Sequence, residues 1–137
     1  MSIYRAILNI LTADSDFSAA IGSDSGTIKV YTMFPQRTIS KPWAAMKIVN
    51  QVGNPTKSTG SDVDNVSFSI RIFNNDMDDV IDTAEKCRTA LEGKSGTFDT
   101  VAIGDIEFES FNDDFLFFEG EQPLLYRELN FEIWVTP

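Results

Sequence analysis

The chain has 137 residues and a hydrophobic content of 42%, which fits a single domain over residues 1–137 with a buried core. Its formal net charge of −10, from 21 acidic and 11 basic residues, argues against gripping nucleic acid or an anionic membrane, because both need clustered Lys and Arg. The absence of histidine removes Ser-His-Asp and Cys-His catalysis and imidazole metal sites.

The N-terminal part predicts two short helices and then a strand. A first helix follows a capping Ser2, with apolar residues at helical spacing: Ile3, Ile7, Ile10 and Leu11. After a break at 12–15, a second helix carries Phe17, Ala20 and Ile21 and ends at Gly22. Residues 27–33 then alternate as a strand, with Ile28 and Val30 pointing inward.

The middle of the chain predicts a hairpin with a long polar loop. Residues 43–52 are apolar on both faces, which is typical of a strand that is covered on both sides. Residues 53–62 hold Gly, Asn, Pro, Ser and Thr without an apolar anchor, so we expect a flexible loop there. Residues 64–73 alternate again as the second strand of the hairpin.

The C-terminal half predicts a helix and several strands. The helix begins at Asn74, Asn75 or Asp76, where acidic residues suit its dipole, and Gly93 ends it. Strands are expected over 98–103 and 106–111, with a turn at 112–114 and a further apolar run at 115–118. The last strand, 125–135, has a long period-two alternation broken only by Arg127, and we expect it to be available as a sheet edge.

These elements predict an α+β fold, with a single mostly antiparallel sheet and helices packed on one face. Most of the Phe side chains should fill the core: Phe68, Phe98, Phe108, Phe111, Phe115, Phe117, Phe118 and Phe131. The chain has one cysteine, Cys87, so it has no disulfide framework, and we expect a core thiol in a reducing compartment. No secretion signal or transmembrane run is expected.

Fragments that resemble catalytic or binding motifs have simpler explanations. The segment Gly93-Lys94-Ser95 ends like a phosphate-binding loop but closes a helix instead of opening one. An acidic set fits a solvated helix start better than a cation site: Asp76, Asp78, Asp79 and Asp82. A carboxylate pair for hydrolysis would come from Asp113, Asp114, Glu119 and Glu121, although turns also attract Asp. No cofactor, metal or catalytic residue is therefore predicted.

Four aromatic residues fall out of phase with the inward rows: Trp43, Phe73, Tyr126 and Trp134. One interpretation is a second layer of core under helices. The other is a contact surface with another protein, where aromatic side chains are enriched. The sequence leaves both interpretations open.

The order of these motifs resembles the tail terminator, or tail-completion, proteins of long-tailed bacteriophages. The first helix is followed by Ala13-Asp14-Ser15, and Tyr31 and Pro35 form a Tyr-x-x-x-Pro element. A strand–helix unit over 68–91 follows, and the chain closes with a strand of the Leu-Tyr-Arg-x-Leu-x-Phe-x-Ile type over 125–133. The resemblance covers nearly the whole chain.

The resemblance implies a structural virion protein. Such a protein forms a ring, usually a hexamer, on the head-proximal end of the tail tube, stops tube polymerisation and presents a surface to the head–tail connector. DNA passes through the ring without specific binding, and an acidic wall would suit that passage. The ring would be assembled in the host cytoplasm, with itself, the tail tube protein and the connector as partners.

Candidate contact residues follow from this hypothesis. A closed ring joins two different patches of neighbouring subunits. The proposed contacts are aromatic and charged side chains of the predicted strands and of the acidic helix, together with one lysine of the loop: Tyr126, Trp134, Trp43, Phe73, Arg71, Arg127, Asp78, Asp79, Asp82 and Lys57. The alternatives are a head-completion or neck connector protein, a small carboxylate-dependent hydrolase and a generic protein-binding module.

Overall fold

A computed structural model of the chain describes residues 3–33, 40–55, 62–98, 100–117, 120 and 122–136. Helix α1 (Ile3–Ala13) buries Ile7, Ile10 and Leu11, as its spacing predicts. Helix α2 (Ser15–Ile21) begins after Asp14, whose side chain accepts a hydrogen bond from Phe17 N at 2.9 Å. It ends at Gly22, which has a φ of 76°. The predicted break between these helices is therefore narrower than expected.

The predicted strand over 27–33 is divided between two sheets. Strands β1 (Ser23–Asp24) and β2 (Thr27–Ile28) form a small antiparallel ribbon. Strand β3 (Val30–Thr32) instead runs parallel to the start of β4 in the main sheet. The expectation of a single sheet was therefore wrong, because a tight turn at Ser25 and Gly26, both with positive φ, pairs the first half of this segment locally.

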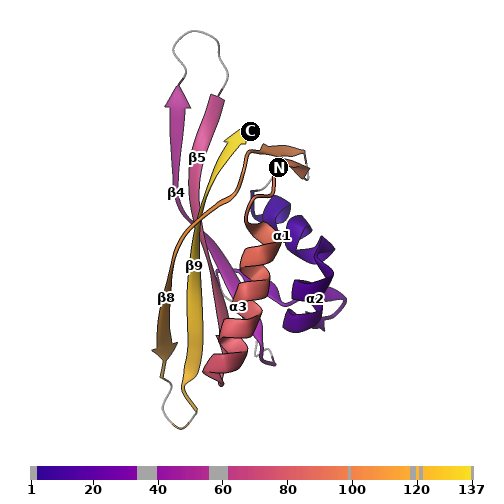
Figure 1. The fold of residues 1–137 in the computed structure, drawn as a ribbon, viewed down its shortest axis with the longest axis vertical. Coiled ribbons are helices and arrows are strands. Elements are labelled where there is room, and N and C mark those ends of the chain that lie inside the picture. Colours follow the sequence, from indigo (N-terminus) through magenta and orange to yellow (C-terminus); the bar gives the residue numbers. More distant parts are fainter. Residues whose placement is uncertain are drawn as a thin grey trace.

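The long hairpin consists of β4 (Trp43–Pro55) and β5 (Asp62–Asn74), paired antiparallel along their whole length. In Figure 1 their ends extend beyond the helices. Both strands reach further into the predicted 53–62 loop than expected, and residues 56–61 lie outside the described part of the chain. A register shift between Ile48 and Asn50 leaves Val49 as an extra residue in β4.

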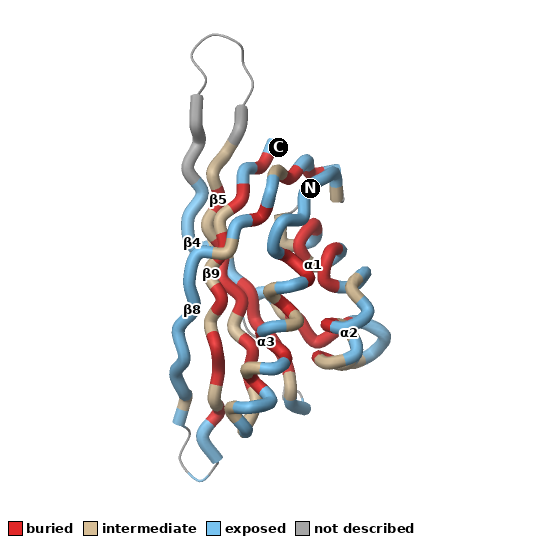
Figure 2. The backbone as a smooth tube through the Cα atoms, viewed as in Figure 1, coloured by how far each residue is buried: buried red, intermediate tan, exposed pale blue. Residues whose placement is uncertain are grey.

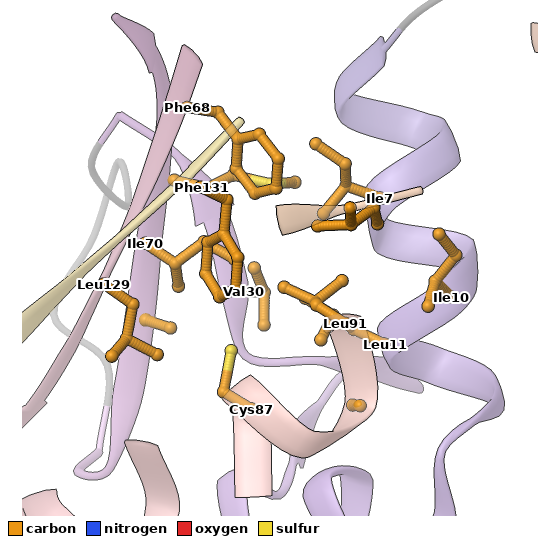
Figure 3. Packing of buried hydrophobic residues seen from close by; sticks show 14 of the residues in the cluster. Ile7, Ile10, Leu11, Val30, Phe68, Ile70, Cys87, Leu91, Leu129 and Phe131 are labelled. Carbon is orange, nitrogen blue, oxygen red and sulfur yellow. The ribbon is translucent and has the colours of Figure 1, made fainter. Parts of the chain in front are cut away.

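Helix α3 (Met77–Leu91) begins after Asp76, whose carboxylate accepts a hydrogen bond from Asp78 N at 2.8 Å. The main buried cluster joins residues of all three helices to alternate residues of β4, β5 and β9. Phe68 and Phe131 stack at its centre with their ring centroids 5.2 Å apart, and Figure 3 shows them close to Ile7, Leu91 and Cys87. Figure 1 shows the three helices on the same side of the sheet. None of the described helices is long and apolar enough to cross a membrane.

The strands after α3 differ from their predicted bounds. The expected strand over 98–103 is a hairpin of β6 (Gly96–Phe98) and β7 (Val101–Ile103). Strand β8 (Glu107–Leu116) continues through the turn predicted at 112–114. The Asp and Asn residues of that segment are paired across to β9 (Leu124–Thr136), and an ion pair to Arg127 holds Asp113 in the strand.

Strand β9 is an inner strand of the sheet. Its partners are β5 on one side and β8, followed by β7, on the other. The expectation that the last strand provides a sheet edge was therefore wrong, because β8 covers that side. The order β3-β4-β5-β9-β7-β6, with β8 also on β9, confirms a mostly antiparallel sheet with one parallel pair.

Candidate assembly surface

Three of the four out-of-phase aromatic residues form a second buried cluster. Trp43 stacks on Phe73 with the ring centroids 4.2 Å apart, and Phe73 lies 5.1 Å from Tyr126. These side chains are 8%, 0% and 8% exposed, respectively. Adjacent β-strands, β4, β5 and β9, bring them together, because Phe73 pairs with both Trp43 and Tyr126. We call the sheet face that carries this cluster the outer face.

Arg71 lies on the outer face beside this cluster. Its Nε donates to Glu128 Oε2 at 2.7 Å, and its guanidinium lies 4.9 Å from the centre of the Tyr126 ring. Glu128 is the residue directly across from Arg71 on β9. This cross-strand pair helps to fix the β5–β9 register within one subunit.

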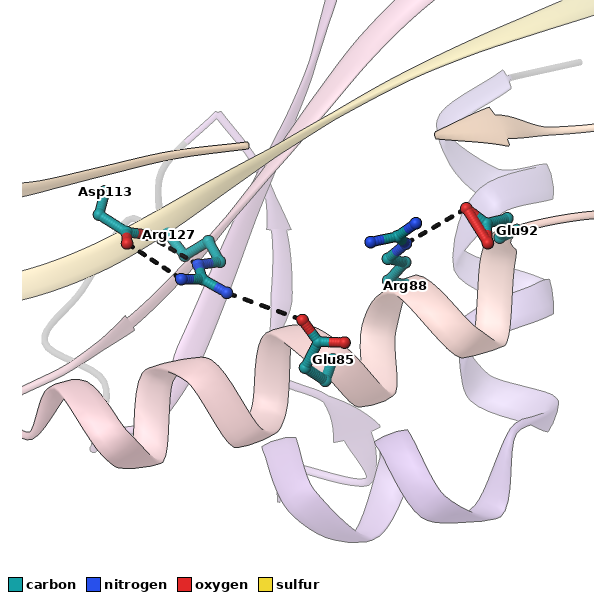
Figure 4. A network of polar contacts seen from close by, with 5 residues as sticks. All are labelled: Glu85, Arg88, Glu92, Asp113 and Arg127. Carbon is teal, nitrogen blue, oxygen red and sulfur yellow. Dashed lines mark hydrogen bonds and ion pairs between the residues drawn. The ribbon is translucent and has the colours of Figure 1, made fainter. Parts of the chain in front are cut away.

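Arg127 points to the opposite face, toward α3. Its guanidinium donates to Asp113 through Nε at 2.7 Å and Nη2 at 3.0 Å, and Nη1 lies 3.7 Å from Glu85 Oε1 (Figure 4). The hydrogen bond to Asp113 is the main cause that raises the pKa of this guanidinium. Arg127 also stacks 4.0 Å over the ring of Phe111. This network explains how the apolar row of β9 tolerates a buried charge.

The other predicted contact residues lie apart from the aromatic cluster. Trp134 is 42% exposed near the end of β9. Asp78, Asp79 and Asp82 are exposed on α3, where Lys86 Nζ lies 3.1 Å from Asp82 Oδ2. Lys57 lies outside the described residues. Of the nine predicted contact residues that the structure describes, Trp43, Phe73, Tyr126 and Arg71 therefore lie together on the outer face.

Of the carboxylates suggested for hydrolysis, the two that the structure describes, Asp113 and Asp114, do not converge. Asp113 is bound to Arg127, and Asp114, the next residue of the same strand, has its side chain on the other face of the sheet. Glu119 and Glu121 lie outside the described residues. Cys87 is fully buried, and this burial raises the pKa of its thiol, which disfavours the reactive thiolate.

Sequence reasoning missed a different carboxylate group on the outer face. A hydrogen bond between the carboxyl groups of Glu109 and Glu132 raises the pKa of Glu109 and lowers that of Glu132. The Asn65 amide also donates to Glu132. A register shift between Phe108 and Ser110 makes Glu109 the extra residue of a bulge. No simple alternation pattern in the sequence indicates such a bulge.

Three Phe side chains expected in the core are exposed on or next to β8. Phe111, Phe115 and Phe117 are 48%, 57% and 67% exposed, respectively. Figure 2 shows β8 as a mostly exposed strand at the side of the sheet. An apolar run in the sequence does not reveal whether another strand or a helix covers it, so these residues could not be separated from core residues beforehand.

Comparison with known proteins identifies the same family as the sequence resemblance. The chain matches the family described as "Tail completion protein gp17" over residues 5–136. A chain of the solved structure "Virion of native gene transfer agent (GTA) particle" has a similar fold, with a TM-score of 0.75 at 14% sequence identity. The match covers 99% of this chain and 96% of that chain. The comparison with curated protein sequences finds no match.

Proposed function

Because this chain belongs to the tail completion protein gp17 family, we propose that it caps the head-proximal end of the tail tube as a hexameric ring. Membership of this family makes the chain a structural protein of a phage tail. In this position the ring would stop tube polymerisation and offer a joining surface to the head–tail connector. The match over nearly the whole chain is the observation that carries this proposal.

The described surface favours assembly over bond chemistry. Asp113 and Asp114, the two suggested hydrolytic carboxylates that the structure describes, point to different faces, and the one thiol is buried. The sheet offers long strands, an exposed Trp134 on the outer face and exposed Phe side chains on β8. Exposed aromatic anchors of this kind are common in contacts between proteins. Trp134 and the carboxylates of α3 are the accessible contact candidates, whereas Trp43, Phe73 and Tyr126 shape the sheet that presents them.

The charge of the chain fits a ring through which DNA passes. A net charge of −10 gives an acidic wall that repels phosphate and leaves few sites where DNA would bind. The ring would be assembled in the host cytoplasm and would remain in the virion between tube and connector.

The proposal is tested by adding the purified chain to polymerising tail tube protein from the same phage. We expect shorter tubes that carry a ring at one end in negative-stain images. Capped ends should fail to elongate when more tube protein is added, whereas an unrelated acidic protein should have no effect. Tubes that keep growing at both ends would contradict the proposal. Binding to heads that carry the connector, without any binding to tubes, would favour the neck connector alternative instead.

A further inference from the structure

The exposed large apolar residues of the described chain lie mainly at two opposite sides of the main sheet. Phe111 and Phe115 lie on β8, and Phe117 directly follows it. Met33 follows β3, and Val49 is the extra residue of β4. Only Trp134, among the described residues of this kind, lies elsewhere. Since monomeric proteins rarely leave contiguous apolar surface on sheet edges, such edges are candidates for pairing with another chain.

Met33 on one side of the sheet and Phe111 on the other lie at the same height along the strands. Met46 pairs with Ile70, Ile70 with Leu129, and Leu129 with Phe111. Met33 donates its backbone N–H to Met46 O at 2.9 Å, so Met33 and Phe111 occupy one level. Val49 lies between Ile48 and Asn50, which correspond through the same strand pairs to Phe108 and Glu107.

The strand directions also match. Each neighbouring pair in the series β4, β5, β9 and β8 is antiparallel, so β4 and β8 run in opposite directions. Rotation of a copy about an axis along the strands preserves both strand direction and height. The β8 side of one copy then meets the β3–β4 side of the next in an antiparallel arrangement, like the rest of the sheet.

The charges at this level are complementary. Glu107, Glu109 and Glu132 crowd together on the β8 side, and this crowding contributes to the raised pKa of Glu109. Among the described residues, none of the three forms an ion pair with Lys or Arg. Lys47 is exposed on β4 and likewise has no ion-pair partner in the described chain. Strand pairing through Ser69 and Asn130 places Lys47 at the level of Ser110, next to Glu109.

We propose that the β8 edge of one subunit docks on the β3–β4 edge of a second copy, with Lys47 of one copy facing Glu109 of the next. Because the two edges differ, the contact is heterologous and repeats around a ring. The inference deepens the ring function proposed above and rests on it. It names the subunit contact as sheet edge to sheet edge, at the height where Lys47 of one copy lies opposite Ser110 and Glu109 of the next.

A charge-exchange experiment tests this contact. Lys47→Glu and Glu109→Lys each place like charges across the interface, so each should raise the concentration needed for half-assembly by about tenfold. The double variant K47E/E109K restores opposite charges at every interface and should assemble like the wild type. Lys94→Glu, an exposed charge change away from both edges, is the matched control. Assembly is followed by native mass spectrometry, alone and with tail tube protein, and thermal unfolding checks that each variant folds.

The outcomes separate the contact from the function. Single variants that assemble like the wild type, or a double variant that does not recover, would overturn the edge contact while leaving a tube-capping ring intact. A twofold dimer in which β8 meets β8 would also overturn it. A wild-type chain that forms no ring and does not stop tube growth would overturn the proposed function and the contact together.

Discussion

The two faces of β5 and β9 are built from alternate residues of the same strands, yet they serve different purposes. On the side of the main buried cluster, an apolar row including Phe68, Phe131 and Ile133 packs against the helices. On the outer face, a small aromatic cluster gives way to polar and charged residues such as Arg71, Glu128 and Glu132. The helix-covered face therefore holds most of the core, while the exposed part of the outer face and the sheet edges are the surfaces that we propose for assembly.

The largest expected effect on folding comes from Phe131→Ala. Phe131 is 1% exposed and contacts both Phe68 and Phe108, so its truncation should lower the free energy of unfolding by about 3–5 kcal/mol. Phe115→Ala on β8 is the matched control, because its side chain is 57% exposed and should cost far less. Urea unfolding of the two variants measures the difference. Equal losses would show that β8 is as buried as the core.

The buried ion network should give an intermediate effect. Asp113→Ala removes the closest ion-pair partner of Arg127 and leaves the longer ion pair to Glu85 and the stacking on Phe111. We expect a loss of about 1–3 kcal/mol in unfolding free energy. Asp114→Ala, on the other face of the same strand, should change it little. If the two variants unfold at the same urea concentration, the network does not stabilise the fold.

The Glu109–Glu132 pair should give a small, pH-dependent effect. Because the pKa of Glu109 is raised in the folded state, there is a pH range just above the ordinary carboxyl pKa in which folded Glu109 keeps a proton that unfolded Glu109 has released. Stability from this group therefore falls as the pH rises above the ordinary carboxyl range. Because the pKa of Glu132 is lowered in the folded state, its contribution to the free energy of unfolding is lost as the pH falls below the ordinary carboxyl range. Glu109→Gln keeps a donor without the charge, so its melting temperature should exceed that of the wild type at pH 7 and converge with it in acid. A constant difference across pH would contradict the shared proton.

Trp134→Asp should have the smallest effect on folding but a clear effect on assembly. The side chain is 42% exposed, so thermal unfolding should change little. If the outer face contacts the tube or a neighbouring subunit, tube capping should be lost. Light scattering and tube-length measurements on the folded variant decide this. If the variant still caps tubes, Trp134 does not contribute to assembly, and the sheet edges remain the proposed contact surfaces.

The sequence predicted the helices and the hairpin well because their signals are local. Helical spacing, the Asp76 cap and the alternation in β5 and β9 each depend on a few neighbouring residues. The position of β9 within the sheet depends on β8, whose run through 112–114 looked like a turn. The Asp113–Arg127 ion pair that holds this segment as a strand joins residues distant in sequence, and no local pattern reveals it.

The candidate surface was predictable only in part for the same reason. Out-of-phase aromatic residues correctly indicated a second group on the sheet, but the pattern could not distinguish the buried Trp43, Phe73 and Tyr126 from the exposed Trp134. The exposure of Phe111 and Phe115 follows from β8 being the outer strand on that side of β9. Strand order is a property of the whole fold, so these residues were indistinguishable from core residues in the sequence.

Hydrogen–deuterium exchange of the free chain and of the chain bound to tail tubes tests the central claim most directly. We expect new amide protection along β8 and along the β3–β4 edge, with little change in the already protected strands β5 and β9. Protection that appears only in the helices, or no change in β8 although a ring has formed on the tube, would contradict the division between a folding face and assembling edges.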